Sequence, residues 1–188
     1  MANFGFINHY LNLNPLSNRL SGLLRHFFTP IMISRLMPYL PCHRALDFGP
    51  LRSKAGAITT GVGIMCPFLP QHFVTLSHER VVKKIVGGVR MARNWGADIV
   101  GLGGFTSIFC DEGAEIVDTV DVPITSGNTL TACLAIQGLI AGAHLMGVKL
   151  AQARLAVIGG TGDIGSACVR KLGRSVASIC IAARNEKK

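Results

Sequence analysis

The sequence predicts an α/β protein, with one α/β domain followed by the beginning of a second domain built on a parallel sheet. Three observations support this prediction. Residues 154–183 read as strand, glycine turn, helix and strand. Short apolar strands alternate with helical patterns over residues 51–150, which is typical of α/β architectures. Apolar residues make up 49% of the chain and charged residues 15%, so a sizeable core can form.

The glycine turn carries the most specific signal in the sequence. An apolar run rich in β-branched residues ends at Gly159, and Gly162 and Gly165 follow before a helical pattern. In dinucleotide-binding folds the first glycine permits a tight turn, the second admits a pyrophosphate, and the third lets the helix approach the strand. The helix N-terminus adds free N–H groups and a partial positive charge. We interpret residues 151–188 as the first βαβ unit of an incomplete Rossmann-type (doubly wound) domain; a plain α/β turn is the alternative.

The end of the second strand indicates which dinucleotide binds. NAD-selective folds place an acid there, whereas this chain has Arg184, a side chain that can pair with a ribose 2′-phosphate. Glu186 is the only nearby acid and lies past the strand. We therefore predict NADP(H); the alternative is that Arg184 is an ordinary solvated charge. The predicted cofactor-binding residues are Gly159, Thr161, Gly162, Asp163, Ile164, Gly165, Arg184 and Asn185.

The positive charge is concentrated in the first half of the chain. Residues 1–94 contain 11 Lys and Arg against 2 Asp and Glu, while residues 95–188 contain 8 of each. This imbalance indicates an acidic partner or an anionic surface for the first half. No basic-aromatic interleaving or known nucleic-acid module is present, so we expect no nucleic-acid partner.

Residues 1–50 are predicted to form a basic, amphipathic N-terminal extension. Residues 1–46 contain no acid, and Leu and Phe recur at helical spacing between Leu16 and Phe28. Such a helix suits a membrane surface or a partner's groove, and an organellar transit peptide has a similar composition. The plain alternative is a helix packed on its own domain. The start of the chain lacks the charged segment of a secretory signal peptide.

The cysteines indicate a reducing compartment. Six are present and none forms a CxxC pair, so we interpret them as reduced core thiols of a cytoplasmic protein, and we expect no metal site. A set of disulfides is the weaker interpretation. The cysteines are Cys42, Cys66, Cys110, Cys133, Cys168 and Cys180.

Residues 51–150 are predicted to form the α/β domain on the substrate side. Strands over 98–102 and 122–124 each lead into a loop rich in glycine and hydroxyl side chains. Because ligands of open α/β sheets gather beyond the carboxyl ends of strands, we expect the two loops to face each other beside the nicotinamide. Tight structural turns are the alternative, with Asn128 or Thr129 as a helix N-cap. The predicted substrate-side residues are Gly104, Phe105, Thr106, Ser107, Ser126, Gly127, Asn128 and Thr129.

The following helix, residues 130–146, is nearly apolar. Hydropathy alone suggests a membrane span, with Gly138 and Gly142 as a packing motif. Gln137 and His144 interrupt the run, so we predict instead a helix buried between two domains.

The chain resembles the long-chain acyl-[acyl-carrier-protein] reductases of cyanobacteria, which form fatty aldehydes. The resemblance covers roughly residues 55–188 and includes a weaker match at 66–70, where the family lacks the inserted proline. The matching stretches are residues 102–108, 126–129, 159–166 and 182–185.

The resemblance implies a reaction. A cysteine attacks an acyl thioester on acyl carrier protein or coenzyme A, and the acyl-enzyme takes hydride from NADPH and leaves as aldehyde. The family's nucleophilic cysteine lies beyond residue 188, so the catalytic residues are unassigned and the chain alone is expected to be inactive. One alternative is a shikimate-dehydrogenase-like oxidoreductase, although its Lys and Asp pair is not evident. Another is a non-catalytic remnant that serves as a binding module or at a membrane periphery.

Overall fold

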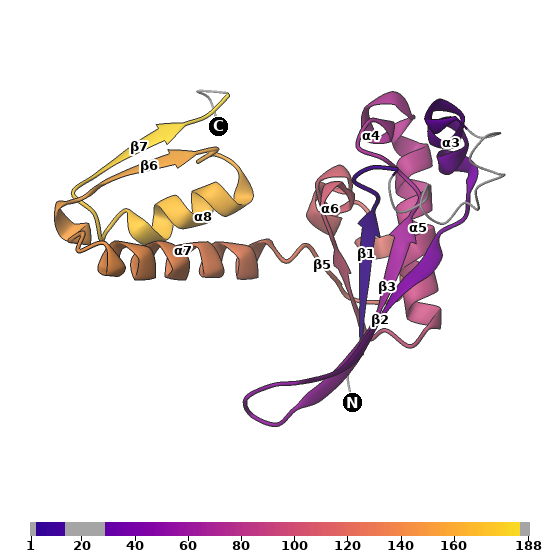
Figure 1. Cartoon of the computed structure of the whole chain (residues 1–188), viewed down its shortest axis with the longest axis horizontal. Coiled ribbons are helices and arrows are strands. Elements are labelled where there is room, and N and C mark those ends of the chain that lie inside the picture. Colours follow the sequence, from indigo (N-terminus) through magenta and orange to yellow (C-terminus); the bar gives the residue numbers. More distant parts are fainter. Residues whose placement is uncertain (1–2, 14–28, 185–188) are drawn as a thin grey trace. The chain divides into compact units, whose positions relative to one another are not determined.

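The chain folds into two compact units, the first ending at Ser126 and the second beginning at Gly127 (Figure 1). The computed structural model describes residues 3–13 and 29–184. Each unit contains parallel strands together with helices, so the predicted α/β class is confirmed. The sequence predicts a boundary after residue 150, but the structure places it before Gly127. The helix over residues 128–145 belongs to the second unit, because it packs on the helix over residues 163–172.

The first unit is built on a five-stranded sheet in the order β2-β3-β1-β4-β5. Strand β1 is parallel to both β3 and β4, and β4 is parallel to β5. Strand β2 is antiparallel to β3 and forms one edge. The strands are β1 (Phe4–His9), β2 (His43–Arg52), β3 (Ile58–Cys66), β4 (Ile99–Leu102) and β5 (Ile124–Thr125).

Helix α5 (His78–Asn94) is the longest helix among the described residues of this unit and covers the parallel strands. The shorter helices are α3 (Pro30–Leu36), α4 (His72–Thr75) and α6 (Phe105–Phe109). The 3-10 helices are η1 (Met37–Tyr39), η2 (Asp111–Gly113) and η3 (Val117–Thr119).

Strand β1 corrects the prediction of a separate N-terminal extension over residues 1–50. Phe4–His9 is the central strand of the sheet, and His43–Arg52 crosses the predicted boundary as the edge strand. The run is short and carries Gly5, where a Cβ would lie 2.7 Å from the Cβ of Ala92. The residue pattern of β1 is therefore determined by packing against α5, which is far away in the sequence. The predicted amphipathic helix between Leu16 and Phe28 lies outside the described residues.

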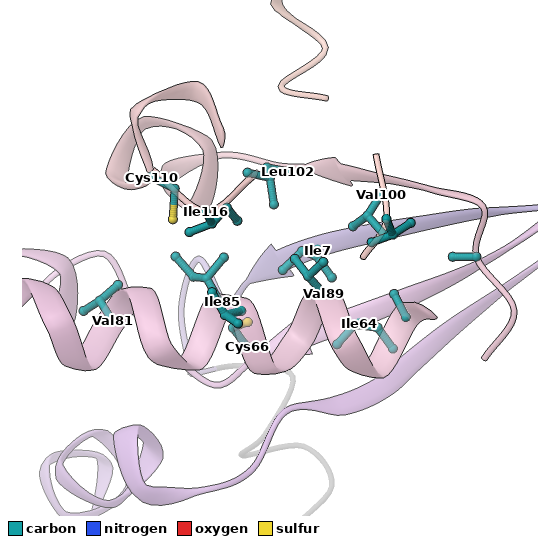
Figure 2. Packing of buried hydrophobic residues seen from close by; sticks show 14 of the residues in the cluster. Ile7, Ile64, Cys66, Val81, Ile85, Val89, Val100, Leu102, Cys110 and Ile116 are labelled. Atoms are coloured by element: carbon teal, nitrogen blue, oxygen red, sulfur yellow. The ribbon is translucent and has the colours of Figure 1, made fainter. Parts of the chain in front are cut away.

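The core of the first unit lies between α5 and the sheet (Figure 2). Val81, Ile85, Val89 and Ala92 recur at helical spacing on α5 and are fully buried. They belong to one buried cluster with strand residues that include Ile7, Ile64, Val100 and Leu102. Each buried aliphatic side chain contributes about 1.5–3 kcal/mol. The next residue, Val82, is only partly buried, so the core face of α5 begins at Val81.

The second unit contains a parallel two-stranded sheet with a connecting helix, as predicted for the start of a βαβ arrangement. The strands pair in register from Arg154 opposite Ser178 to Ile158 opposite Ala182. Helix α7 packs against α8, yet only Ala132 of α7 is buried. The elements are α7 (Asn128–Leu145), η4 (Leu150–Gln152), β6 (Arg154–Ile158), α8 (Asp163–Leu172) and β7 (Ser178–Ala182). No helix within residues 3–13 and 29–184 is long and apolar enough to cross a membrane.

Replacing Ile85 by alanine should lower the free energy of unfolding by about 2–5 kcal/mol, because a fully buried side chain leaves a cavity between α5 and the sheet. The measurement is urea unfolding followed by the fluorescence of Trp95, the only tryptophan, which directly follows α5. The control is Lys83→Ala at an exposed position of the same helix, with an expected change within about 0.5 kcal/mol. Equal losses in both variants would contradict the assigned core face.

Candidate functional site

The glycine turn joins β6 to α8 and ties the ends of both strands together. Gly159 has φ of +78°, a conformation that favours glycine, and its N–H donates to the carbonyl of Ala182 at 2.8 Å. Gly162 is the N-cap of α8 in extended conformation, and its N–H donates to the carbonyl of Gly159 at 3.0 Å. The turn therefore places the start of α8 at the carboxyl ends of β6 and β7.

The fold requires a glycine at position 165, because a side chain there would overlap the backbone of the glycine turn. A Cβ at this position would lie 2.2 Å from the carbonyl oxygen of Gly159 and 3.0 Å from the Cα of Gly160. Neither atom can move without breaking the turn, because both belong to the backbone. The absence of a side chain at Gly165 thus allows the first turn of α8 to contact the glycine turn, which is the role expected of the third glycine.

Gly162 differs from Gly165, because none of the residues that the structure describes demands a glycine there. Its φ of −78° suits any residue, and a Cβ would meet only the carbonyl oxygen of Gly159, at an ordinary 3.5 Å. The missing side chain leaves open space in front of the N-terminus of α8. A pyrophosphate that approaches the backbone closely needs such a space, so the residues present fit a dinucleotide.

A cavity of about 500 Å³ lies beside the turn. It brings the glycine turn and Arg184 together on one surface, although they are separated by a helix and a strand in the sequence. Asp163 and Ile164 form the first turn of α8 and do not line this cavity, and Asn185 lies outside the described residues. The lining residues are Ile158, Gly159, Thr161, Gly162, Ala182, Ala183 and Arg184.

Asn128 links the start of α7 to the start of α8. Its side-chain amide donates to a carboxylate oxygen of Asp163 at 3.3 Å. Asp163 lies in the first turn of α8, where the helix dipole also stabilises a negative charge. We expected Asn128 or Thr129 to cap α7, but Gly127 holds that position with φ of +74°. Asn128, a predicted substrate-side residue, is thus hydrogen-bonded to Asp163, a predicted cofactor-binding residue.

In the first unit, the loop after β4 begins with Gly103 and Gly104 and leads into α6. Gly104 has φ of +58°, and a Cβ there would lie 3.0 Å from Nε2 of His9. The Thr106 hydroxyl donates to the carbonyl of Gly103 at 2.8 Å, and the Ser107 hydroxyl donates to Glu112 at 2.6 Å. Both side chains are buried and their hydrogen bonds hold the loop, which is the tight structural turn named as the alternative; that the loop faces a ligand stays a prediction.

Gly104 and Phe105 stay candidates for the surface of this edge, since Phe105 is exposed. Strand β5 lies beside β4 with Thr125 opposite Gly101, so Ser126 leaves the sheet at the same carboxyl edge as Gly103. The predicted apposition of these loops with Gly127 and Thr129 beside a nicotinamide stays a prediction.

His9 is the residue at this edge that the sequence analysis missed. It ends the central strand β1, is 3% exposed, and lies in ring contact with Phe73 and Phe105. Its Nδ1 donates to the carbonyl of Tyr10 at 3.0 Å, and its Nε2 accepts from the N–H of Phe105 at 3.3 Å. Only the neutral ring with the proton on Nδ1 satisfies both partners. The signal was available, because His9 follows an apolar run at the end of a strand.

Burial lowers the pKa of His9, against a smaller opposite effect of its hydrogen bond to Tyr10. Because the unfolded chain binds the proton near pH 6.5, folding stability should be lost as the pH falls through that value towards the lowered pKa of the folded state. His72, whose pKa burial also lowers, should contribute in the same direction.

We therefore expect His9→Gln to flatten part of the pH dependence of the urea midpoint between about pH 7 and pH 5. The wild-type protein, measured under the same conditions, gives the reference profile. An unchanged profile in His9→Gln would mean that folding does not shift the pKa of His9, which would contradict this account.

Comparison with known proteins gives a distant relationship. No family model matches the chain. The long-chain acyl-[acyl-carrier-protein] reductase of Synechococcus elongatus is 34% identical over 147 residues, which are 72% of this chain and 42% of that protein. Aminotransferase PigE of Serratia sp. is 28% identical over 179 residues, which are 90% of this chain and 20% of that protein.

Among solved structures, the hetero-hexameric glutamate dehydrogenase from Thermus thermophilus aligns with 97% of this chain and 42% of its own, at 16% identity and a TM-score of 0.39. The chain spans less than half the length of the curated relatives that it matches. The sequence match thus supports a distant relationship between this chain and long-chain acyl-[acyl-carrier-protein] reductase.

Proposed function

We propose that this protein is an NADPH-dependent oxidoreductase that reduces a long-chain acyl thioester, on acyl carrier protein or coenzyme A, to a fatty aldehyde. The choice of NADPH as cofactor rests on the open space at Gly162. This space lies beside the turn at Gly159 and in one cavity with Arg184. The distant relationship to long-chain acyl-[acyl-carrier-protein] reductase supports the substrate class.

The second unit has the parts needed to hold the dinucleotide. The free N–H groups at the start of α8 can donate to the pyrophosphate, which reaches them because Gly162 has no side chain. Arg184 follows β7 and can form paired hydrogen bonds with a 2′-phosphate. Asn128 holds the carboxylate of Asp163, the one acidic side chain in the first turn of α8.

The part of the chain described here contributes binding and orientation. When bound, a nicotinamide dinucleotide supplies the hydride that reduces a carbonyl carbon. None of the described cysteines lines the cavity beside the glycine turn, so the thiol that accepts the acyl group is not assigned to this surface.

Exposed basic side chains of the first unit support the proposal that its partner is anionic. Lys83 and Arg90 are exposed on α5, and Arg80 of the same helix lies over the ring of Tyr39, 4.3 Å from its centroid. A cationic helix face favours encounter with an acidic protein or with the phosphates of coenzyme A. Charge alone equally supports a second candidate, a binding module that docks on an anionic membrane surface.

Arg184→Ala should weaken NADPH binding about tenfold or more and leave NADH binding nearly unchanged, because a charge-assisted contact is worth about 1.5–3 kcal/mol. The dissociation constants are measured by calorimetric titration of both cofactors. Arg174→Ala, at an exposed position of the second unit outside the cavity, is the control and should change neither. Equal losses for both cofactors in Arg184→Ala would contradict a role with the 2′-phosphate.

Gly162→Val and Gly165→Ala should separate binding from folding. The valine at position 162 is compatible with the extended backbone but fills the space that a pyrophosphate needs, so NADPH binding should be lost while the unfolding transition is retained. The alanine at position 165 would press on the Gly159 carbonyl and should lower the stability of the unit itself. Unchanged NADPH affinity in Gly162→Val would leave the turn with a structural role alone.

The activity is tested by incubating the protein with a long-chain acyl thioester and NADPH and measuring aldehyde. Aldehyde formation that depends on NADPH supports the proposal. NADPH binding without turnover is the result expected of the 188 residues alone, whereas absence of NADPH binding would favour the binding-module alternative.

A further inference from the structure

Two cysteines meet beneath α5, far from the glycine turn in the sequence. Cys66 ends β3, and Cys42 directly precedes β2. In the antiparallel pairing of these strands His43 lies opposite Met65, so the same register places Cys42 opposite Cys66. Their sulfur atoms lie 3.5 Å apart. A disulfide bond is about 2.05 Å long, so a small approach of two facing side chains would close it.

A glycine in α5 makes room for both sulfur atoms. A Cβ at Gly88 would lie 3.2 Å from Sγ of Cys66 and 3.6 Å from Sγ of Cys42. Glycine within a helix costs about 0.5–1 kcal/mol relative to alanine, so its presence here is compensated by the space it leaves. The neighbouring Gly87 provides the contrast, because a Cβ there would meet nothing.

Lys84 lies one helical turn before Gly88 and brings a positive charge to the pair. Its ammonium group donates to the carbonyl oxygens of Pro38 and Leu40, just before Cys42 in the chain. The Cys42 thiol in turn reaches the carbonyl of Lys84 at 3.4 Å. The ammonium is thereby held by backbone acceptors on the segment that leads into Cys42.

The two thiols differ in acidity and in access. The hydrogen bond from Cys66 lowers the pKa of Cys42, burial opposes this, and the Lys84 charge lowers the pKa again. The pKa of Cys66 is raised well above its ordinary value by the hydrogen bond to Cys42 and by burial. Cys42 is half-buried, whereas Cys66 is fully buried. A reagent from solvent therefore meets Cys42 first, and Cys42 is the more acidic of the two thiols.

We propose that Cys42 and Cys66 form a redox-active dithiol site that closes reversibly to a disulfide on reaction with a small-molecule disulfide. Cys42 is the attacking thiol, Cys66 is the resolving thiol, and Lys84 stabilises the thiolate. The other described cysteines differ: Cys110 is buried with its pKa raised to about 12, mainly by burial, and Cys133 is exposed. Within the described ranges no three His, Cys, Asp or Glu side chains gather to hold a metal ion.

The reaction balances without any further reagent. The Cys42 thiolate attacks one sulfur of the small disulfide, a mixed disulfide forms, and one small thiolate leaves. The Cys66 sulfur then attacks Sγ of Cys42, releases the second small thiol, and gives up its proton to solvent or to the leaving thiolate. Two protein thiols are oxidised by two electrons, and one small disulfide is reduced to two thiols.

The test is incubation of the folded protein with oxidised glutathione, followed by alkylation of free thiols, tryptic digestion without reduction, and mass spectrometry. Trypsin places Cys42 in the peptide 36–44 and Cys66 in the peptide 55–80, and both are free of other cysteines. We expect most of these two peptides to be joined to each other by a disulfide that dithiothreitol removes. In Cys42→Ser, buried Cys66 should stay a free thiol, whereas Cys133→Ser should leave the cross-link unchanged.

Cys133 serves as an internal reference for exposure to the oxidant. Glutathione on Cys133 while Cys42 and Cys66 both stay free would overturn the proposal, as would a lasting mixed disulfide on Cys42 without the cross-link. Glutathione on Cys66 in the Cys42→Ser variant would also overturn it, because the assigned order of attack requires Cys42. Lys84→Met adds a rate measurement: alkylation of Cys42 by iodoacetamide near neutral pH should slow several-fold, while alkylation of Cys133 should not change.

Discussion

The contact between the first turn of α8 and the backbone of the glycine turn determines the geometry of the candidate cofactor site. Because Gly165 has no Cβ, the helix starts against the carbonyl of Gly159 rather than a side chain's width away. This close seating places the N-terminus of α8 at the carboxyl ends of β6 and β7, where Arg184 also emerges. The free N–H groups and the guanidinium are thus brought to one cavity by a single steric requirement. Gly162, which nothing in the fold requires, is the position where space is left for a ligand.

In the first unit, a glycine without a Cβ likewise permits a close approach at the carboxyl edge of the sheet. Gly104 adopts a positive φ beside His9, and the ring of His9 accepts the N–H of Phe105. Both nitrogens of the buried imidazole are hydrogen-bonded, so the ring supports the loop. Beneath α5, Gly88 makes a third close approach, this time for two sulfur atoms.

The sequence predicted the features that depend on local spacing. The glycine turn, its flanking strands and the position of Arg184 follow from residues within about thirty positions of one another. Strand β1 escaped prediction because its neighbours are β3 and β4, more than fifty residues away, and because its short run carries a glycine that packs on α5. The hydrogen bonds of the Thr106 and Ser107 hydroxyls within their loop could not be predicted, since a hydroxyl after a glycine pair can as readily bond the loop as a ligand. The pairing of Cys42 with Cys66 depends on the register of β2 and β3, which no spacing between the cysteines reveals.

Hydrogen exchange of the backbone, measured with and without cofactor, tests the central claim most directly. If the glycine turn binds NADPH, added NADPH should slow the exchange of amides over residues 159–166 and at residues 182–184, and NADH at the same concentration should slow it less. The amides of β1 to β5 should exchange at unchanged rates. NADPH protection confined to the first unit, or absent from the glycine turn, would contradict the assignment of this turn as the cofactor site.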